Sequence, residues 1–206
     1  MPTLTLSKSN MTTEFSLWKS KEKALPDTIT VEGRAFPIRS DFRTILKVLA
    51  ILSDPEIIDA HRSSVAATYL FLGDVPSAPW WESFGQFLRC GDKNRSASGK
   101  RDFDYEFDAQ EIYASFRMIY GIDLFATDLH WWEFSALLNG LFVVDCPLSE
   151  KLRLRNLDTR NCKDRSKAEQ AKQSVQIPDR ISEDDERTND LIAERLKRGE
   201  DVSDLL

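Results

Sequence analysis

His130 and Glu133 come nearest, by residue type and spacing, to a catalytic or metal-binding pair. They stand three positions apart in the segment HWWE, so both side chains would lie on one face of a helix. A protein metal site needs three or four converging ligands, and His61 is the only other histidine of the chain. We therefore interpret His130 and Glu133 as structural or surface polar residues. We predict no metal, no cofactor and no enzymatic activity, and an enzyme that uses this pair is kept as a minor alternative.

Two further patterns resemble ligand-binding loops only in part. The segment from Gly91 to Arg101 has seven residues between its glycines instead of the four of a phosphate loop, and Arg101 stands where that loop has Ser or Thr. The acidic and aromatic run at 102–108 lacks the Gly and Glu that a calcium loop places at its sixth and twelfth positions. We expect a solvated loop at the first segment and, at the second, an extended lead-in whose aromatic side chains anchor the next helix.

Trp80-Trp81 and Trp131-Trp132 are adjacent tryptophan pairs, a pattern that could provide stacking platforms for single-stranded nucleic acid. Such platforms lie in a basic groove, whereas the charged residues next to these pairs are acidic. Adjacent side chains diverge by about 100° on a helix. In each pair we expect one ring in the core and the other at a rim, where an exposed Trp81 would anchor a protein partner.

Two helices between residues 108 and 141 are predicted to position these side chains. Asp108 and Glu111 form a capping box at the start of the first helix, and Gly121 supplies its left-handed stop. The second helix has its cap at Thr127 or Asp128 and closes at Gly140. It is apolar on nearly every side, which predicts burial in the core. The apolar residues of the pair are, in chain order, Ile112, Phe116, Ile119, Tyr120, Leu129, Trp131, Trp132, Phe134, Leu137, Leu138 and Leu141.

Upstream of this pair, the patterns predict a β-hairpin and three helices. Glu32-Gly33 is the hairpin turn, Ser40 or Asp41 caps the first helix, and Asp54-Pro55-Glu56 starts the second. The expected ranges are 28–31 and 34–38 for the strands and 42–52, 54–72 and 80–88 for the helices.

Composition excludes several classes of protein. With 206 residues, of which 41% are hydrophobic, the chain can bury a core. Its net charge of −6 argues against a nucleic acid as the main partner. Three cysteines without close pairing indicate a reducing compartment. The N-terminus has no secretory signal pattern, and no apolar run approaches the ~20 residues of a membrane helix. We expect a cytoplasmic protein that does not bind membranes.

The composition changes after Phe142, the last aromatic residue. Residues 151–172 hold eight Lys or Arg against three Asp or Glu, and residues 179–206 hold five against ten. With so few large apolar side chains, this half should order only by docking on the core, on itself or on a partner. Helices are predicted at Leu148–Gln176 and Glu183–Arg198. The predicted fold is therefore mainly α, with a loose leader (1–26), a compact helical core domain that begins with a short β-hairpin (27–145), and a charged helical C-terminal extension (146–206).

The motif order of the helix pair resembles the phage structural proteins of the "gp-fifteen" family. The matching segments are Asp104–Asp108, Ile112–Phe116, Tyr120–Leu124, Leu129–Phe134 and Ala136–Leu141. With weaker flanks the resemblance extends over roughly residues 28–198. The residues taken as the family motif are Asp108, Ile112, Tyr113, Phe116, Tyr120, Gly121, Leu129, His130, Trp131, Trp132, Phe134, Leu137 and Leu138.

The resemblance implies a non-enzymatic tail-morphogenesis protein of a phage or prophage, similar to tail assembly chaperones and working in the host cytoplasm. Its implied partners are the tape-measure protein, other tail proteins and, as an open option, further copies of itself. The family brings no catalytic residues. The side chains proposed to contact a partner are Trp81, Lys151, Arg153, Arg155, Leu191 and Leu196. The alternative is a DNA-associated regulator that places the basic stretch 151–172 against phosphates.

Overall fold

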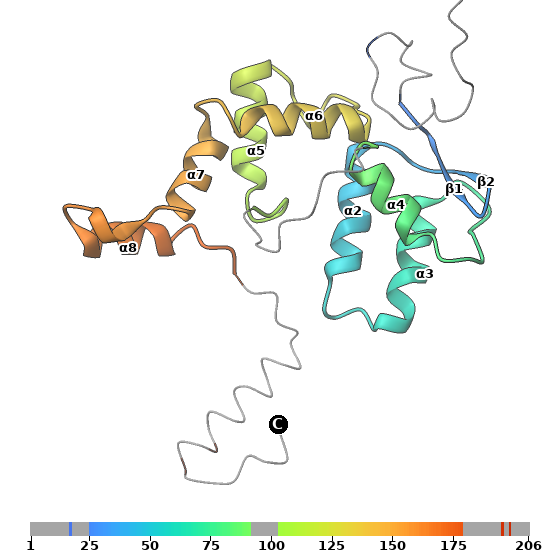
Figure 1. Cartoon of the computed structure of the whole chain (residues 1–206), viewed down its shortest axis with the longest axis horizontal. Coiled ribbons are helices and arrows are strands. Elements are labelled where there is room, and N and C mark those ends of the chain that lie inside the picture. The colour runs from blue at the N-terminus through green and yellow to red at the C-terminus, as the bar shows by residue number, and fades with distance from the viewer. Residues whose placement is uncertain (1–16, 18–24, 92–102, 179–194, 196–197, 199–206) are drawn as a thin grey trace, which may run out of the picture.

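The computed structural model describes residues 17, 25–91, 103–178, 195 and 198 (Figure 1). Within them the fold is mainly α, with one two-stranded antiparallel sheet, as the sequence predicts. The expected leader and the expected helix at 183–198 lie almost wholly outside the described residues; Leu17 is exposed, and Arg195 and Arg198 are helical. The polar loop predicted at 91–101 lies outside them except for Gly91. No helix of the described ranges is long and apolar enough to cross a membrane.

The hairpin forms as predicted. Strands β1 (Thr28–Val31) and β2 (Arg34–Pro37) pair antiparallel around Glu32 and Gly33, whose φ angles of 49° and 80° are both left-handed. A two-residue turn of this kind matches the twist of the two strands. The sheet continues for one residue beyond β2, because Ile38 makes an isolated antiparallel bridge to Phe71.

Helix α2 (Phe42–Ser53) is amphipathic and starts where the sequence predicts. The carboxylate of Asp41 accepts a hydrogen bond from the amide of Thr44 at 2.9 Å, which caps the helix. Phe42, Ile45 and Val48 form its buried face.

Helix α3 (Asp59–Leu70) begins later and ends earlier than predicted. The Asp54 carboxylate accepts from the amide of Glu56 at 2.9 Å, so this aspartate forms a local turn instead of capping a helix. At the other end, the amide of Leu72 donates to the Pro37 carbonyl at 3.0 Å. This pairing with the hairpin draws the chain into an extended conformation at Phe71, before Gly73 is reached. Helix α4 (Trp81–Leu88) follows, close to its predicted range.

The predicted helix pair occupies the centre of the molecule (Figure 1). Helix α5 (Ala109–Ser115) continues into a π-helical turn, η1 (Phe116–Tyr120), and stops at Gly121 with φ 67°, as predicted. Helix α6 (Trp131–Leu141) buries six of its 11 residues. It lies between the part of the fold formed by α2, α3 and α4 and the part formed by α5 and α7 (Pro147–Arg155) (Figure 1).

The charged extension folds as separate short helices, so the single helix predicted at 148–176 is wrong. Its parts are α7 (Pro147–Arg155), the 3-10 turn η2 (Thr159–Asn161) and α8 (Arg165–Gln173). The breaks occur at two aspartates whose carboxylates cap the next element: Asp158 accepts from the amide of Arg160 and Asp164 from that of Lys167, both at 3.1 Å. Short polar side chains that bond to nearby amides compete with a continuous helix.

Candidate functional site

Aromatic packing joins the two central helices to α2. The rings of Phe42 and Phe134 stack with centroids 4.6 Å apart, and those of Phe134 and Phe116 with centroids 5.3 Å apart. Tyr120 donates its hydroxyl to the Leu137 carbonyl at 2.9 Å. Gly140 is the last residue but one of α6, close to the expected end of the helix, and a Cβ there would lie 2.5 Å from the Tyr120 hydroxyl oxygen. Its role is close approach between the helices.

The Trp131-Trp132 pair is wholly buried, so the expectation of one core ring and one rim ring is wrong there. Their indole N–H groups donate to the carbonyls of Leu88 at 3.1 Å and Phe87 at 2.8 Å. These carbonyls belong to the last turn of α4, where a helix leaves its C=O groups without intrahelical partners. The pair thus fastens α6 to the end of α4. The expectation holds for Trp80, which is buried, and Trp81, which is exposed.

His130 and Glu133 form the N-terminal cap of α6, in place of Thr127 or Asp128. The His130 Nδ1 atom accepts from the amide of Trp132 at 3.0 Å, and the His130 amide donates to the Glu133 carboxylate at 3.1 Å. His130 Nε2 lies 2.9 Å from the Pro26 carbonyl oxygen, so the neutral tautomer protonated at Nε2 satisfies both contacts. The described residues contain no group of three or more side chains placed to hold a metal ion.

Replacing His130 with alanine should lower the free energy of unfolding by about 0.5–2 kcal/mol, the usual cost of losing an N-cap. His130→Asn should keep most of the wild-type free energy of unfolding, because asparagine caps helices well. Chemical denaturation of the purified full chain measures both changes. If these variants instead release a stoichiometric metal ion, the structural interpretation of the pair is wrong.

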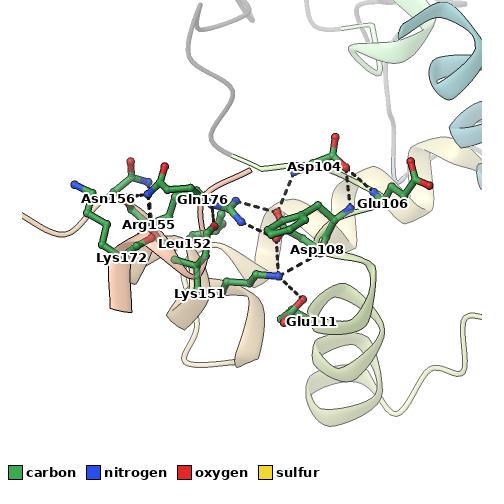
Figure 2. A network of polar contacts seen from close by, with 12 residues as sticks. Asp104, Glu106, Asp108, Glu111, Lys151, Leu152, Arg155, Asn156, Lys172 and Gln176 are labelled. Carbon is green, nitrogen blue, oxygen red and sulfur yellow. Dashed lines mark hydrogen bonds and ion pairs between the residues drawn. The ribbon is translucent and has the colours of Figure 1, made fainter. Parts of the chain in front are cut away.

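An ionic cluster ties α5 to α7 around Asp108 (Figure 2). Arg155 binds both carboxylate oxygens of Asp108, with Nη2 2.7 Å from Oδ1 and Nη1 2.9 Å from Oδ2. Lys151 Nζ lies 3.0 Å from Asp108 Oδ1 and 2.9 Å from the Glu111 carboxylate. The Asp104 amide donates to Asp108 Oδ2 at 3.0 Å. The capping box predicted for Asp108 and Glu111 therefore does not form, because both carboxylates bind cations of α7.

The cluster is almost closed to solvent. The Asp108 side chain is fully buried and that of Arg155 is 4% exposed. Arg155 also donates from Nε to the Val175 carbonyl at 2.7 Å, which holds the segment after α8 against α7.

The run at 102–108 is not the extended lead-in that was expected. In its described part, the Asp104 carboxylate accepts hydrogen bonds from the amides of Glu106 and Phe107 and closes a turn.

Burial and hydrogen bonding act in opposite directions on these groups. Burial alone would raise the pKa of Asp108, but hydrogen bonds from Arg155, the Asp104 amide and Lys151 outweigh it and hold that pKa below its usual value. For Lys151, burial favours the neutral amine, whereas the hydrogen bonds to Glu111 and Asp108 prevail and raise its pKa. Both shifts favour the charged forms, so the folded state keeps Asp108 and Lys151 ionised at neutral pH.

The lowered pKa of Asp108 predicts a stabilisation that acid removes. A carboxylate with a depressed pKa in the folded state contributes stability above its unfolded pKa of about 3.9, and that contribution is lost as the pH falls further. Asp108→Asn should therefore be less stable than wild type at pH 7 but lose less stability between about pH 5 and pH 2. Urea unfolding across this range tests the difference in slope. Asp145→Asn, at an exposed carboxylate, is the matched control, and an Asp108→Asn slope equal to wild type would contradict the prediction.

The residues proposed as partner contacts fall in different places. Arg155 is buried and Lys151 is bound inside the cluster, which corrects their expected place on a contact surface. Arg153 is exposed and pairs with Asp145, and Trp81 is exposed. Leu191 and Leu196 lie outside the described residues.

The sequence contains a spacing from which the buried face of α7 could have been predicted. Leu148, Lys151, Leu152 and Arg155 recur at i, i+3, i+4 and i+7, the pattern of one helix face. Sequence reasoning counted the two cations as part of a charged stretch. It also missed Ser115, which is buried. The Ser115 hydroxyl accepts a hydrogen bond from the Leu148 amide at 3.0 Å and so binds the first turn of α7.

A pocket of about 320 Å³ opens beside α6. Aromatic rings form one wall: Phe103 lies 4.8 Å from Tyr105 and 5.7 Å from Phe142, measured between ring centroids. Other lining residues come from α2 and the last turns of α4. The lining residues are Leu49, Gly85, Leu88, Arg89, Phe103, Tyr105, Trp131, Ser135, Leu138, Asn139 and Phe142.

Comparison with known proteins supports the resemblance seen in the motifs. A family model described as Bacteriophage Gp15 protein matches residues 86–177, from the end of α4 past α8. This range contains the central helix pair and the whole ionic cluster but is shorter than the span of roughly 28–198 expected from the motifs. Neither the curated proteins nor the solved structures gave a match. The match over residues 86–177 supports a relationship to the bacteriophage Gp15 family, a family of phage structural or morphogenesis proteins.

Proposed function

We propose that this chain acts in tail morphogenesis, as a protein of the tail assembly chaperone type that binds the tape-measure protein while the tail is built. The observation that carries the proposal is the family match over residues 86–177. A chaperone of this type works by binding another chain, so it needs a contact surface and no catalytic group.

Exposed apolar side chains in the matched region support a binding role. Met118, Phe125 and Val143 are 67%, 83% and 86% exposed, and Phe142 beside Val143 is partly exposed at the rim of the pocket. Each of these side chains would be removed from water if another chain docked over it, which contributes favourably to binding.

The geometry disfavours the alternative of a DNA-associated regulator. In the stretch 151–172, Lys151 and Arg155 bind buried or half-buried carboxylates of α5 and cannot reach a phosphate without breaking the cluster. Other cations of the stretch pair with nearby carboxylates at the surface, as in Arg153–Asp145, Arg160–Asp158 and Arg165–Glu169. Because acidic side chains lie among the Lys and Arg residues, the stretch does not present a continuous positively charged surface to a phosphate backbone.

Co-expression with a tape-measure protein from the same phage or prophage tests the proposal. The full chain should co-purify with that protein, and excess duplex DNA should not displace it. Because the regulator alternative also predicts weaker binding at high salt, salt sensitivity alone does not separate the two functions. Tight, sequence-preferring binding to DNA with no complex with the tape-measure protein would refute the chaperone proposal.

A further inference from the structure

We propose that the pocket beside α6 receives a large apolar side chain from a helix of a partner protein, and that Arg89 pairs with a carboxylate of the same helix. This inference deepens the proposed function, on which it depends for the identity of the partner, because it names the site and the chemistry of the segment bound there. All lining residues except Leu49 and Gly85 lie within the matched range 86–177.

The pocket is suited to an apolar side chain. Its walls come from Leu49, Leu88, Leu138 and the aromatic rings of Phe103 and Phe142. The volume of about 320 Å³ is at the lower end for ligand pockets, which fits a side chain better than a large cofactor. Burying apolar surface there stabilises a complex by roughly 25 cal/mol per Å² before the costs of association.

Arg89 supplies the charge that selects the partner. It is half-buried at the end of α4, where its guanidinium folds back over Gly85; a Cβ on that glycine would lie 3.4 Å from Arg89 Nη1. No carboxylate among the described residues pairs with this guanidinium, in contrast to Arg153, Arg155, Arg160 and Arg165. A partly desolvated arginine gains most from a carboxylate, which its planar donors bind at two points.

A single helix can provide both groups. Side chains three or four positions apart lie on the same face of a helix, so a leucine or an aromatic residue and a neighbouring Asp or Glu would enter together. This is recognition of an amphipathic helix in a groove. The predicted ligand is therefore an acidic amphipathic segment of the tape-measure protein.

Charge reversal at the pocket is the first arm of the test. In titrations of the full chain with the tape-measure protein, Arg89→Glu should weaken binding roughly tenfold or more, and Arg89→Gln should weaken it less. Arg34→Glu makes the same charge change at an exposed arginine on β2 that does not line the pocket, and it should bind like wild type. Equal melting temperatures would show that the variants are folded. Wild-type affinity in Arg89→Glu would overturn the inference.

A second arm tests the pocket without the tape-measure protein. The probe is 8-anilinonaphthalene-1-sulfonate, an aromatic anion that combines an apolar body with a negative charge. It should shift the NMR signal of the Trp131 indole N–H, at the pocket, and leave that of Trp81 unchanged; Arg89→Glu should bind it about tenfold more weakly. If the tape-measure protein fails to bind while the probe behaves as expected, the proposed function falls and the pocket chemistry stands. A probe that leaves Trp131 unshifted, or that binds Arg89→Glu as well as wild type, overturns the pocket.

The acidic end of the chain itself is the competing occupant. Residues 201–206, DVSDLL, also join carboxylates to leucines. Deleting residues 199–206 should leave the Trp131 signal and the affinity for the tape-measure protein unchanged. If the deletion shifts that signal and raises the affinity, the pocket holds a segment of its own chain, and the proposed partner contact is wrong.

Discussion

Replacing Arg155 with methionine is expected to lower the free energy of unfolding by about 3–5 kcal/mol, the usual cost of removing one partner from a buried ion pair. The change leaves the fully buried Asp108 carboxylate with Lys151 as its remaining cation and removes the donor to the Val175 carbonyl. Helix α7 and the segment after α8 should both loosen. Urea unfolding at pH 7, followed by circular dichroism, measures the loss.

Two further variants separate the buried pair from an ordinary surface contact. Arg153→Met removes an exposed arginine from the same helix and should cost less than about 1 kcal/mol. Combining Arg155→Met with Asp108→Leu should recover much of the stability, since replacing both charges leaves no buried charge without its partner. If Arg155→Met unfolds like Arg153→Met, the cluster does not hold α7 in place.

Replacing Trp132 with alanine should cost about 3–5 kcal/mol, the range for large-to-small aromatic changes in a core. The ring is 2% exposed and packs beside Phe87, and its loss also leaves the Phe87 carbonyl without the indole donor at 2.8 Å. Phe116→Ala, at a fully buried ring, should fall in the same range. Thermal and urea unfolding of the full chain measure both.

Trp81→Ala is the matched control for Trp132→Ala, because Trp81 is exposed and makes no buried hydrogen bond among the described contacts. It should change stability much less. Trp132→Phe keeps most of the apolar volume but not the donor, so its cost should lie between the other two. A Trp132→Ala variant that melts like wild type would mean that the buried face of α6 has been misassigned.

Much of the fold follows from local patterns. The hairpin turn at Glu32-Gly33 forms because the two residues adopt left-handed backbone angles. Asp41 caps α2 by accepting a hydrogen bond from the amide of Thr44, three residues further on. The stop at Gly121 is likewise local. Each of these features depends on residues only a few positions apart, which is why a single sequence predicts them.

The incorrect boundaries have a different origin. Helix α6 starts at Trp131 instead of near Thr127 because the preceding segment is drawn against the start of α2: the Phe42 amide donates to the Leu129 carbonyl and the Trp131 amide to the Ser40 carbonyl. Arg43, which an amphipathic helix would point to solvent, binds the carbonyls of Leu124 and Thr127. Local helix propensity cannot predict such hydrogen bonds between segments about 85 residues apart in the sequence.

By itself, the sequence determined the mainly helical class, the buried helix pair with its aromatic core and the family to which residues 86–177 are related. Only the tertiary structure decided that Asp108 binds Arg155 instead of capping its own helix, that both Trp131 and Trp132 are buried, and that Arg89 faces an apolar pocket. The physical reason is distance along the chain. Periodicity and capping depend on neighbours within about one helical turn, whereas a buried charge or indole finds its partner only when separate helices pack together.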